Sequence, residues 1–302
     1  MATNNPVGHE SVRNKPTFDS FYMALYGNRW GGLRDKLSGS RESGLFCSPW
    51  ADQEGDLPGN PMPGVEGARR SAEAFESPPL DPAGMPRWYA MDIASIVAAQ
   101  SLQVAEGDRV LDMCAAPGGK SLVLASGLGS RGELVVNDRS STRRARLRKV
   151  LDQYLPVELR ARVTVSGHDA SKWGLHETNA YDRILLDAPC SSERHVLADP
   201  KALAQWSPAR AKGLARRQYA MLAAALEAVR VGGRILYSTC SLVPDENEGV
   251  IERLLSDSKR AGRARVVPLE APIGEANGHG WAMFPDCSEW GPIWMAAIER
   301  LA

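Results

Sequence analysis

The sequence predicts an α/β fold in which helices cover both faces of a mostly parallel sheet. The first observation is that short apolar strands alternate with helical segments from Trp88 onward, as in parallel sheets with helical crossovers. The second is that 302 residues suffice for one large domain with an appendage, and that 43% apolar and 24% charged residues are ordinary for a globular protein.

Two regions precede this alternating pattern. Residues 18–37 carry apolar side chains mostly at helical spacing, which predicts one amphipathic helix packed on the main domain. Residues 39–87 are rich in proline, glycine and charge, with PGNPMPG at their centre, and we expect an extended connection there. We therefore divide the chain into an N-terminal helical arm with its connection, residues 1–87, and a main domain, residues 88–302.

The main domain begins with an apolar helix, MDIASIVAAQSL, and continues as strands and helices in turn. The predicted strands are RVLDM (Arg109–Met113), ELVVN (Glu133–Asn137), RVTVS (Arg162–Ser166), DRILLD (Asp182–Asp187) and GRILYST (Gly233–Thr239), and WGPIWMAAIE is a candidate last strand. The predicted helices between them are KSLVLASGL, a basic segment from Ser141 to about Leu155, and a segment near Pro208–Arg230. Strands this apolar are typical of a sheet buried on both faces.

Charge and cysteine content exclude several classes of protein. Lys plus Arg and Asp plus Glu both number 36, so no global field attracts nucleic acid, although a local basic patch could. No apolar run approaches the roughly 20 residues that cross a bilayer, and the first residues lack the apolar core of a secretory signal. The 5 cysteines are scattered without a CxxC pair, which argues against a disulfide framework and a zinc site and favours a reducing compartment. We expect no membrane association, no metal and a cytoplasmic protein.

The turn after the first strand, LDMCAAPGGKS (Leu111–Ser121), is built to approach a ligand. Its glycines and small residues expose backbone amides at the start of the next helix. A phosphate-binding P-loop is one interpretation, but Cys114 stands where GxxxxGK[ST] requires glycine. A dinucleotide site would need GxGxxG, which is absent. A nucleoside-type cofactor such as S-adenosylmethionine is the third interpretation.

Acidic residues at successive strand ends favour the third interpretation. Asp112, Asp138, Asp169 and Asp187 follow the first four strands. Asp138 follows the glycine-containing turn at the spacing at which nucleotide-binding folds place an acid that accepts hydrogen bonds from ribose hydroxyls. Asp169 lies within reach of an adenine amino group. Each Asp alone could be a helix cap, but four together predict a cofactor site. The candidate cofactor-binding residues are Cys114, Ala115, Ala116, Pro117, Gly118, Gly119, Lys120, Asp138, Arg143, Asp169 and Asp187.

Two cysteines follow neighbouring strands of the predicted sheet. Cys190 comes after the fourth strand in DAPC and Cys240 after the fifth in YSTC, so both thiols should face one cleft. A single cysteine is most often a small buried hydrophobe, but two beside a methyl-donor site indicate chemistry. We expect Pro244 and the acids after it to form the first turn of a helix whose N-terminus lowers the pKa of Cys240.

Four motifs resemble one family. DMCAAPGGK, VVNDRS, DAPCSS and YSTCSLVPDENE are similar to the motif set of the Sun-type (NSUN, Fmu-like) RNA cytosine-5 methyltransferases. The resemblance implies a class I (Rossmann-like) methyltransferase fold with a mostly parallel seven-stranded sheet, S-adenosylmethionine as cofactor, and a catalytic main domain. FDSFYMALYGNRWGGL, SSERHV and WGPIWM are most similar to the branch that methylates small-subunit ribosomal RNA in mitochondria, which makes the mitochondrion the alternative location. SSERHV departs from the commoner glycine-containing continuation of DAPCS.

The resemblance also implies roles for individual residues. Carbon 5 of cytosine becomes nucleophilic only after a thiolate adds to carbon 6, and a soft, activated cysteine suits that addition. The family implies that Cys240 attacks and that Cys190 assists product release, whereas the residues alone leave the two roles open. Asp187 would contact the N3 and amino edge of cytosine, and Lys120 would lie near the cytosine or the cofactor carboxylate.

The substrate is expected to be RNA, with ribosomal RNA favoured. Arg139–Lys149 and the helix carrying Arg210, Lys212, Arg216 and Arg217 are basic candidates for phosphate contact, although each could be a solvated face. The target cytosine must leave its stack to reach the cleft. Zero net charge and no recognisable RNA-binding module predict help from a partner protein or a ribosomal particle. The alternatives are a transfer RNA methyltransferase, a non-catalytic cofactor-binding RNA scaffold and a P-loop NTPase.

Overall fold

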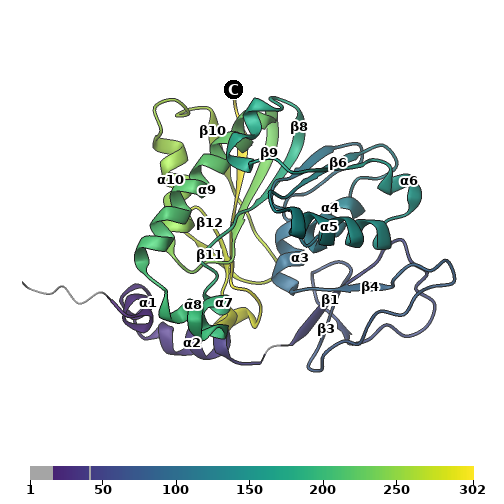
Figure 1. Ribbon diagram of the computed structural model, residues 1–302, viewed down its shortest axis with the longest axis horizontal. Helices are drawn as coiled ribbons and strands as arrows, with labels where there is room; N and C mark the ends of the chain where they lie inside the picture. Colours follow the sequence, from purple (N-terminus) through teal and green to yellow (C-terminus); the bar gives the residue numbers. More distant parts are fainter. Residues whose placement is uncertain (1–15, 41) are drawn as a thin grey trace, which may run out of the picture.

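A nine-stranded sheet organises the molecule (Figure 1). The computed structural model describes residues 16–40 and 42–302. The strands of this sheet are β5 (Arg109–Asp112), β6 (Glu133–Asn137), β7 (Val163–Ser166), β8 (Tyr181–Asp187), β9 (Val229–Thr239), β10 (Ala264–Val267), β11 (Glu275–Asn277), β12 (Gly280–Met283) and β13 (Ile293–Arg300). Their order is β11-β12-β13-β9-β8-β5-β6-β7, with β10 also paired to β13.

The strand order creates a switch point beside β5. The chain runs outward through β5, β6 and β7, then returns to place β8 on the other side of β5. The pairs among β5 to β9 are parallel, and β13 is antiparallel to β9. The path β7-β6-β5-β8-β9-β13-β10 contains the predicted seven strands, and the β11–β12 hairpin adds two more. The predicted α/β class is confirmed, and ligands bind at such switch points.

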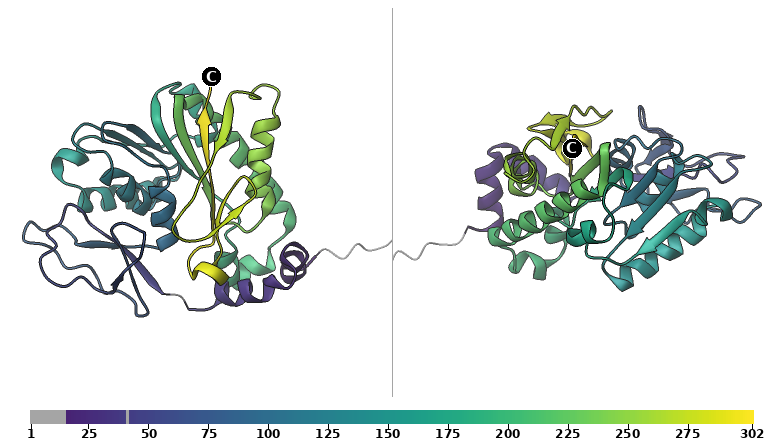
Figure 2. Two further views of the ribbon diagram at one scale, coloured as in Figure 1. Left: turned by 180° about the vertical axis from the view of Figure 1, so that it is seen from behind. Right: turned by 90° about the horizontal axis from the view of Figure 1, so that it is seen from above.

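Helices cover both faces of the sheet and enclose two apolar cores (Figures 1 and 2). On one face lie α3 (Ile93–Gln100), α4 (Gly119–Ser126), α5 (Ser141–Tyr154) and α6 (Val157–Arg160). On the other lie α9 (Pro208–Ala228), α10 (Glu248–Ser256), the turn η1 (Ala170–Leu175) and the N-terminal helices. Shorter elements are α7 (Glu193–Ala198), α8 (Pro200–Ala204), η2 (Pro244–Glu246) and α11 (Pro285–Ser288). Within the described ranges, none of these helices has the length and apolarity of a membrane span.

The predicted single N-terminal helix is wrong, because two helices replace it. They are α1 (Phe18–Tyr26) and α2 (Arg29–Ser38). Gly27 ends α1 at a φ of 54°, in the left-handed region that glycine adopts readily, and its N–H donates to the carbonyl of Met23. The turn lets Tyr22 of α1 stack on Trp30 of α2, with ring centroids 4.8 Å apart. The stacking fixes the two helices of the arm against each other.

The predicted extended connection contains a second, smaller sheet. Its strands are β1 (Ser43–Cys47), β2 (Asn60–Pro61), β3 (Ala68–Ser71) and β4 (Trp88–Ala90), in the order β2-β3-β1-β4. β4 lies beyond residue 87 yet pairs with β1. The division of the chain at residues 87 and 88 therefore stays a proposal.

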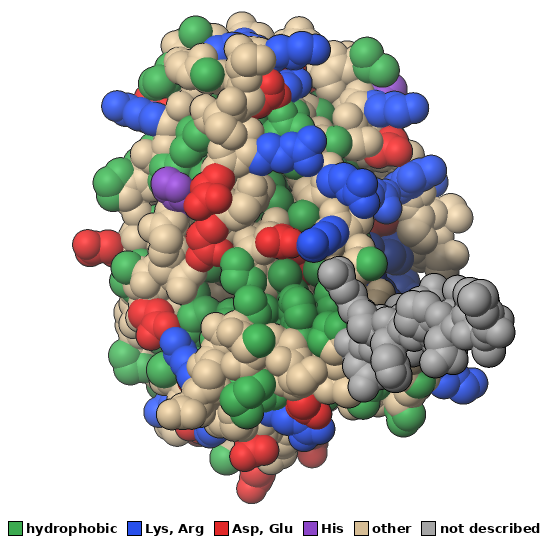
Figure 3. Space-filling model, turned by 90° about the vertical axis from the view of Figure 1, so that its left-hand side faces the viewer, with side chains coloured by type: hydrophobic (Ala, Val, Ile, Leu, Met, Phe, Trp, Pro, Cys, Tyr) green, Lys and Arg blue, Asp and Glu red, His purple; other side chains and the backbone are tan. Residues whose placement is uncertain are grey.

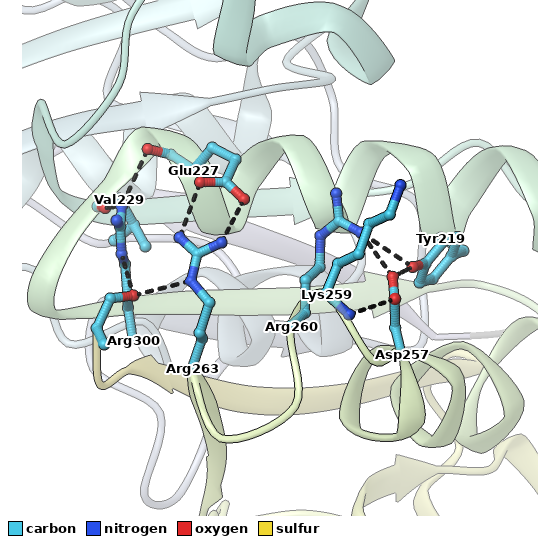
Figure 4. Close-up of polar contacts among 9 residues, drawn as sticks. Tyr219, Glu227, Val229, Asp257, Lys259, Arg260, Arg263 and Arg300 are labelled. Atoms are coloured by element: carbon cyan, nitrogen blue, oxygen red, sulfur yellow. Dashed lines mark hydrogen bonds and ion pairs between the residues drawn. The ribbon is translucent and has the colours of Figure 1, made fainter.

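Two polar clusters tie α9 to the chain that follows α10 (Figure 4). In the first, both carboxylate oxygens of Glu227 accept hydrogen bonds from Arg263, at 2.8 and 2.9 Å. Arg300 adds hydrogen bonds to the carbonyls of Glu227 and Val229, at 3.0 and 2.7 Å. In the second cluster, Asp257 accepts from Tyr219, from Arg260 at 2.6 Å and from the backbone of Lys259 at 3.0 Å.

The Glu227–Arg263 pair should contribute modestly to stability. Their side chains are about one third exposed, at 33% and 29%, so solvent screens the pair even though its geometry is bidentate. A double-mutant cycle with Glu227→Ala and Arg263→Ala, measured by urea unfolding at pH 7, should give a coupling free energy of about 0.5–1 kcal/mol. Because the pKa of Glu227 is lowered, chiefly by the hydrogen bond from Arg263, this coupling should disappear as the pH falls through that pKa. Equal coupling at pH 7 and pH 2.5 would contradict an ionic contribution.

Candidate active site

The turn between β5 and α4 packs too closely for larger residues. Gly118 has a φ of 126°, and an added Cβ would lie 3.0 Å from Val150 on α5. A Cβ on Gly119 would lie 2.8 Å from the ring of Tyr89. Glycine is therefore required for the turn to fit between α5 and the end of β4.

The first hollow at the sheet edge has a volume of about 500 Å³. Its wall includes Cys114, Asn137, Asp138, Arg143, His168 and Arg217. Asp138 accepts a hydrogen bond from the backbone of Ser140 at 2.8 Å and forms an ion pair with Arg143 at 3.3 Å. Arg143 also donates to the carbonyl of Ala116 at 2.5 Å, which ties α5 to the glycine-containing turn. This hollow therefore presents an acid and backbone groups beside β5 and β6.

A second hollow of about 260 Å³ adjoins the first, since Cys114 lines both. It is lined by Tyr89, Ala90, Met91, Ser95, Asp112, Cys114, Ala115, Ala116, Pro117, Gly119, Lys120 and Asp187. Of the predicted cofactor residues, Gly118 and Asp169 line neither hollow. Asp169 instead caps η1 and forms an ion pair with Arg139 at 3.3 Å.

Lys120 and Asp187 form a fixed ion pair on the wall of the second hollow. Their Nζ and Oδ2 atoms are 2.9 Å apart, and Asp187 also accepts a hydrogen bond from Ser238 at 2.9 Å. Burial alone would lower the pKa of Lys120, but the charge of Asp187 and its hydrogen bond outweigh burial and raise it. The ammonium group therefore stays charged, with its second hydrogen bond directed to Ser95 at 3.2 Å.

The two cysteines lie against each other. Their Sγ atoms are 2.7 Å apart, and the backbone N–H of Cys240 donates to Cys190 Sγ at 3.2 Å. The hydrogen bond to Cys240, followed by burial, raises the pKa of Cys190 well above the usual range, so Cys190 keeps its proton. The charge of Cys240 is also among the causes that raise the pKa of Lys120, so the ammonium group lies close enough to this sulfur to interact with it electrostatically.

A helical turn begins at Pro244, as expected, but it is the short 3-10 turn η2, and the α-helix α10 begins only at Glu248. Glu246 belongs to η2 and is fully buried. The Cys240 thiol lies against Cys190, and Lys120 interacts with it electrostatically. The effect of the helix N-terminus on Cys240 stays a prediction.

Sequence reasoning missed a group of buried polar residues behind the cysteines. They are Tyr22, Ser191, Glu193, Gln218, Ser241 and Glu246. The one available signal was their place in the chain, since Ser191 and Ser241 directly follow the two cysteines. Nothing in the local sequence distinguishes a buried glutamate from an acid in an exposed helical turn.

The residues at the two hollows fit S-adenosylmethionine. Asp112 is 1% exposed, and its Oδ1 atom has no hydrogen-bond partner, although Ser121 donates to Oδ2 at 2.7 Å. A buried acceptor without a donor suits a ligand that carries an ammonium group. Asp138 would supply an acid for ribose hydroxyls, and the tight turn brings backbone close to the same space. Among residues 16–40 and 42–302, no cluster of three or more His, Cys, Asp or Glu is placed to hold a metal.

Comparison with known proteins decides the family. The family model described as 16S rRNA methyltransferase RsmB/F matches residues 99–299. The chain belongs to this family. It is 40% identical over 291 residues to the mouse (Mus musculus) 5-cytosine rRNA methyltransferase NSUN4, covering 83% of this chain and 76% of the mouse protein. A zebrafish (Danio rerio) relative named tRNA (cytosine(34)-C(5))-methyltransferase, mitochondrial, is 38% identical over 226 residues, covering 71% of this chain and 61% of that protein.

Membership of the RsmB/F family confirms the resemblance predicted from the four motifs, and S-adenosylmethionine is the cofactor of this methyltransferase. The chain spans 65% of the bovine (Bos taurus) and 47% of the Xenopus tropicalis NSUN4 proteins that it matches. Solved structures support the fold. NSun6 from Pyrococcus horikoshii with SFG has a TM-score of 0.76 at 19% identity, covering 93% of this chain and 97% of that chain. A methyltransferase homologue from Pyrococcus horikoshii has a TM-score of 0.75 at 24% identity, covering 93% of each chain.

Replacing Asp112 with Asn should stabilise the free protein at neutral pH. Burial raises the pKa of this carboxyl from 3.8 to about 7, so the folded state retains a proton that the unfolded state releases. Stability is therefore lost as the pH rises from about 4, and the full cost is present above pH 7. Asp112→Asn should raise the free energy of unfolding by about 1–3 kcal/mol at pH 8 and by less at pH 5.

The same variant should bind S-adenosylmethionine more weakly, because an amide is a poorer partner for an ammonium group than a carboxylate. Urea unfolding at both pH values and equilibrium dialysis of the cofactor measure the two effects. Asp152→Asn is the matched control, since Asp152 is 60% exposed on α5. A variant that is less stable than the parent at pH 8 would contradict this account of Asp112.

Proposed function

We propose that this protein is an RNA (cytosine-5)-methyltransferase that acts on ribosomal RNA, with Cys240 as nucleophile and Cys190 assisting product release. The observation that carries the proposal is the juxtaposition of the two sulfur atoms, 2.7 Å apart, at neighbouring strand ends that also carry the Lys120–Asp187 pair. Covalent catalysis on cytosine needs one thiolate, one proton donor and a charged group for the edge of the base. The site offers all three.

The raised pKa of Cys190 supports this assignment of the two roles. Cys240 adds through its sulfur to carbon 6, and the electron pair of the C5–C6 double bond becomes available at carbon 5. Bound S-adenosylmethionine supplies an electrophilic methyl group. Asp187, paired with Lys120, faces the N3 and amino edge and favours the protonated ring. Cys190 retains its proton until release, donates it to the departing Cys240 sulfur, and as a thiolate then accepts the C5 proton, which restores the aromatic ring.

The family description and the names of several relatives favour small-subunit ribosomal RNA as substrate. The mouse, bovine and Caenorhabditis elegans relatives are named 5-cytosine rRNA methyltransferases. Transfer RNA is the second candidate, because zebrafish and mouse relatives at 38% and 30% identity are named tRNA methyltransferases. Those two names also include the word mitochondrial, which favours the mitochondrial alternative over the cytoplasmic expectation.

Contact with RNA would use the basic residues that have no role at the cofactor hollow. Arg139 and Arg143 pair with Asp169 and Asp138, so part of the basic segment on α5 supports the cofactor site instead. Arg146, Arg148 and Lys149 of α5 remain exposed, as do Arg210, Lys212 and Arg216 of α9, whereas Arg217 is exposed but lines the first hollow. On the side that carries α1, α9 and α10, basic side chains are interspersed with acidic ones around a hydrophobic area (Figure 3). This mixed surface supports the proposal that a partner protein or a ribosomal particle adds RNA affinity.

The two cysteine variants should separate the roles. Cys190→Ala and Cys240→Ala are each incubated with S-adenosylmethionine and total RNA, then run on a denaturing gel. Cys190→Ala should accumulate a covalent protein–RNA adduct, because addition proceeds while release fails, and Cys240→Ala should form none. Sequencing the trapped RNA identifies the target as ribosomal or transfer RNA.

Cys287→Ala is the matched control, since Cys287 is an exposed cysteine on α11. It should make 5-methylcytosine at the parent rate without an adduct. The reverse adduct pattern would exchange the roles of Cys190 and Cys240. No adduct from either variant, together with no 5-methylcytosine from the parent on any RNA, would replace the proposal with a cofactor-binding scaffold.

A further inference from the structure

Two fully buried glutamates lie behind the cysteines. Glu193 begins α7, three residues after Cys190, and Glu246 ends η2, six residues after Cys240. Both side chains are 0% exposed. Burying two carboxylates is costly unless hydrogen bonds or a proton compensate, so their contacts need a complete account.

Glu246 holds the loop that follows Cys190. Its Oε2 atom accepts from the backbone N–H of Ser191 at 3.0 Å and from Nε2 of Gln218 at 2.8 Å. Its Oε1 atom contacts the hydroxyls of Ser191 and Ser241, the latter at 3.0 Å. Gln218 also donates to the carbonyl of Pro189 at 2.9 Å, immediately before Cys190. One carboxylate thus fixes residues next to both cysteines.

Glu193 holds the loop that follows Cys240 and connects it to the N-terminal arm. Its Oε2 atom accepts from the backbone N–H of Leu242 at 3.0 Å. Its Oε1 atom lies 3.1 Å from the hydroxyl of Ser241 and accepts from the hydroxyl of Tyr22 at 2.7 Å. Tyr22 lies on α1, 171 residues away in the chain.

A count of hydrogen atoms at Ser241 requires one proton on the glutamates. The Ser241 oxygen lies within hydrogen-bond distance of Glu193 Oε1 and Glu246 Oε1, and it accepts from the backbone N–H of Val243 at 3.0 Å. A hydroxyl has a single hydrogen, so it donates to only one of the two carboxyl groups. The other contact is a hydrogen bond only if that carboxyl group is protonated and donates to Ser241.

The electrostatic surroundings agree with this count. Burial raises the pKa of Glu193 to about 7 and also raises the pKa of Glu246. The charges of the two glutamates are among the causes that raise the pKa values of Tyr22, Tyr26, Cys190 and Tyr237, and the charge of Glu246 is among those that raise the pKa of Glu193. One proton shared by the two carboxyl groups removes the repulsion between two buried charges.

We propose that Glu193 and Glu246 share one proton through Ser241 and act as positioning residues that hold the Cys190 and Cys240 loops together, with Tyr22 linking this clamp to the N-terminal arm. The effect on methyl transfer rests on the proposed function. The effect on the distance between the thiols does not.

Glutamine substitutions test the shared proton directly. A glutamine amide carries an N–H donor where a protonated glutamate carries its O–H donor, so a single substitution keeps the hydrogen bonds at Ser241 complete. Glu193→Gln and Glu246→Gln should therefore each retain kcat within about threefold. The double variant brings one hydrogen too many to Ser241, and its kcat should fall at least tenfold below the product of the single effects. The KM for S-adenosylmethionine should stay within about twofold, because neither glutamate lines the cofactor hollows.

Two further variants test the clamp and its link to the arm. Glu246→Ala should lower kcat at least tenfold, since it leaves Ser191 and Gln218 without their acceptor. Tyr22→Phe should lower kcat about threefold. Tyr219→Phe is the matched control, because it removes another tyrosine–carboxylate hydrogen bond, to Asp257, far from the cysteines in the chain.

A second readout does not require methyl transfer. In a buffer of reduced and oxidised glutathione, Cys190 and Cys240 lose two hydrogens to form a disulfide while one oxidised glutathione becomes two reduced molecules. Alkylation and mass spectrometry then give the equilibrium constant for this cross-link, which reports how well the two thiols are held together. It should fall at least tenfold in Glu246→Ala and in the double Gln variant, and stay within about threefold of the parent in each single Gln variant.

The outcomes separate the two proposals. A parent protein that makes no 5-methylcytosine but shows these changes in the cross-link equilibrium keeps the clamp and overturns only the proposed function. An active parent whose double Gln variant has the product of the two single effects overturns the shared proton. An unchanged cross-link equilibrium in Glu246→Ala overturns the clamp, whatever happens to kcat.

Discussion

The register between β8 and β9 is the constraint on which the candidate site depends. Asp187 lies opposite Ser238 in this parallel pair and accepts its hydroxyl hydrogen bond. The chain leaves both strands at the same edge, so Cys190 and Cys240 meet a few residues later. A shift by one residue would turn Asp187 away from Lys120 and separate the two sulfur atoms. The apolar interiors of both strands, buried between the two helical layers, hold this register.

The same edge concentrates buried acids whose presence costs stability. Asp112, Glu193 and Glu246 lie at 1% exposure or less, and burial raises the pKa of each. The cost of burial is compensated differently for Asp112 and for the two glutamates. Asp112 keeps an oxygen without a partner, as expected for a site that gains its partner with a ligand, whereas the two glutamates are surrounded by donors. In the proposals made above, the buried acids that are satisfied within the protein position the site, and the unsatisfied one is where the cofactor would bind.

The sequence was most informative where local pattern decides structure. Apolar runs gave β5 to β9 to within a few residues, and the glycine-containing turn pointed to the cofactor hollow, because both signals are local. Gly27 was not recognised as the end of α1, since a helical apolar pattern continues on either side of it. β1 to β4 were missed because their pairing joins segments far apart in a region rich in turn residues. Glu246 lies in a helical turn as expected, but its burial was not predicted, because only tertiary packing distinguishes a buried glutamate from a surface one.

The N-terminal arm is best understood as part of the catalytic domain's support. Tyr22 reaches Glu193, and Tyr26 donates to the carbonyl of Leu242 at 2.6 Å, so two tyrosines one helical turn apart hold the loop after Cys240. Burial of Phe18 and Trp30 around them fixes the angle of α1. Because the aromatic face of α1 is used in this way, only its outer face is left for RNA. On that face Met23 and Leu25 are 49% and 42% exposed, and α1 carries no basic residue. Under the proposed function, affinity for the phosphate backbone would then come from the basic faces of α5 and α9 and from whatever presents the RNA, and not from α1.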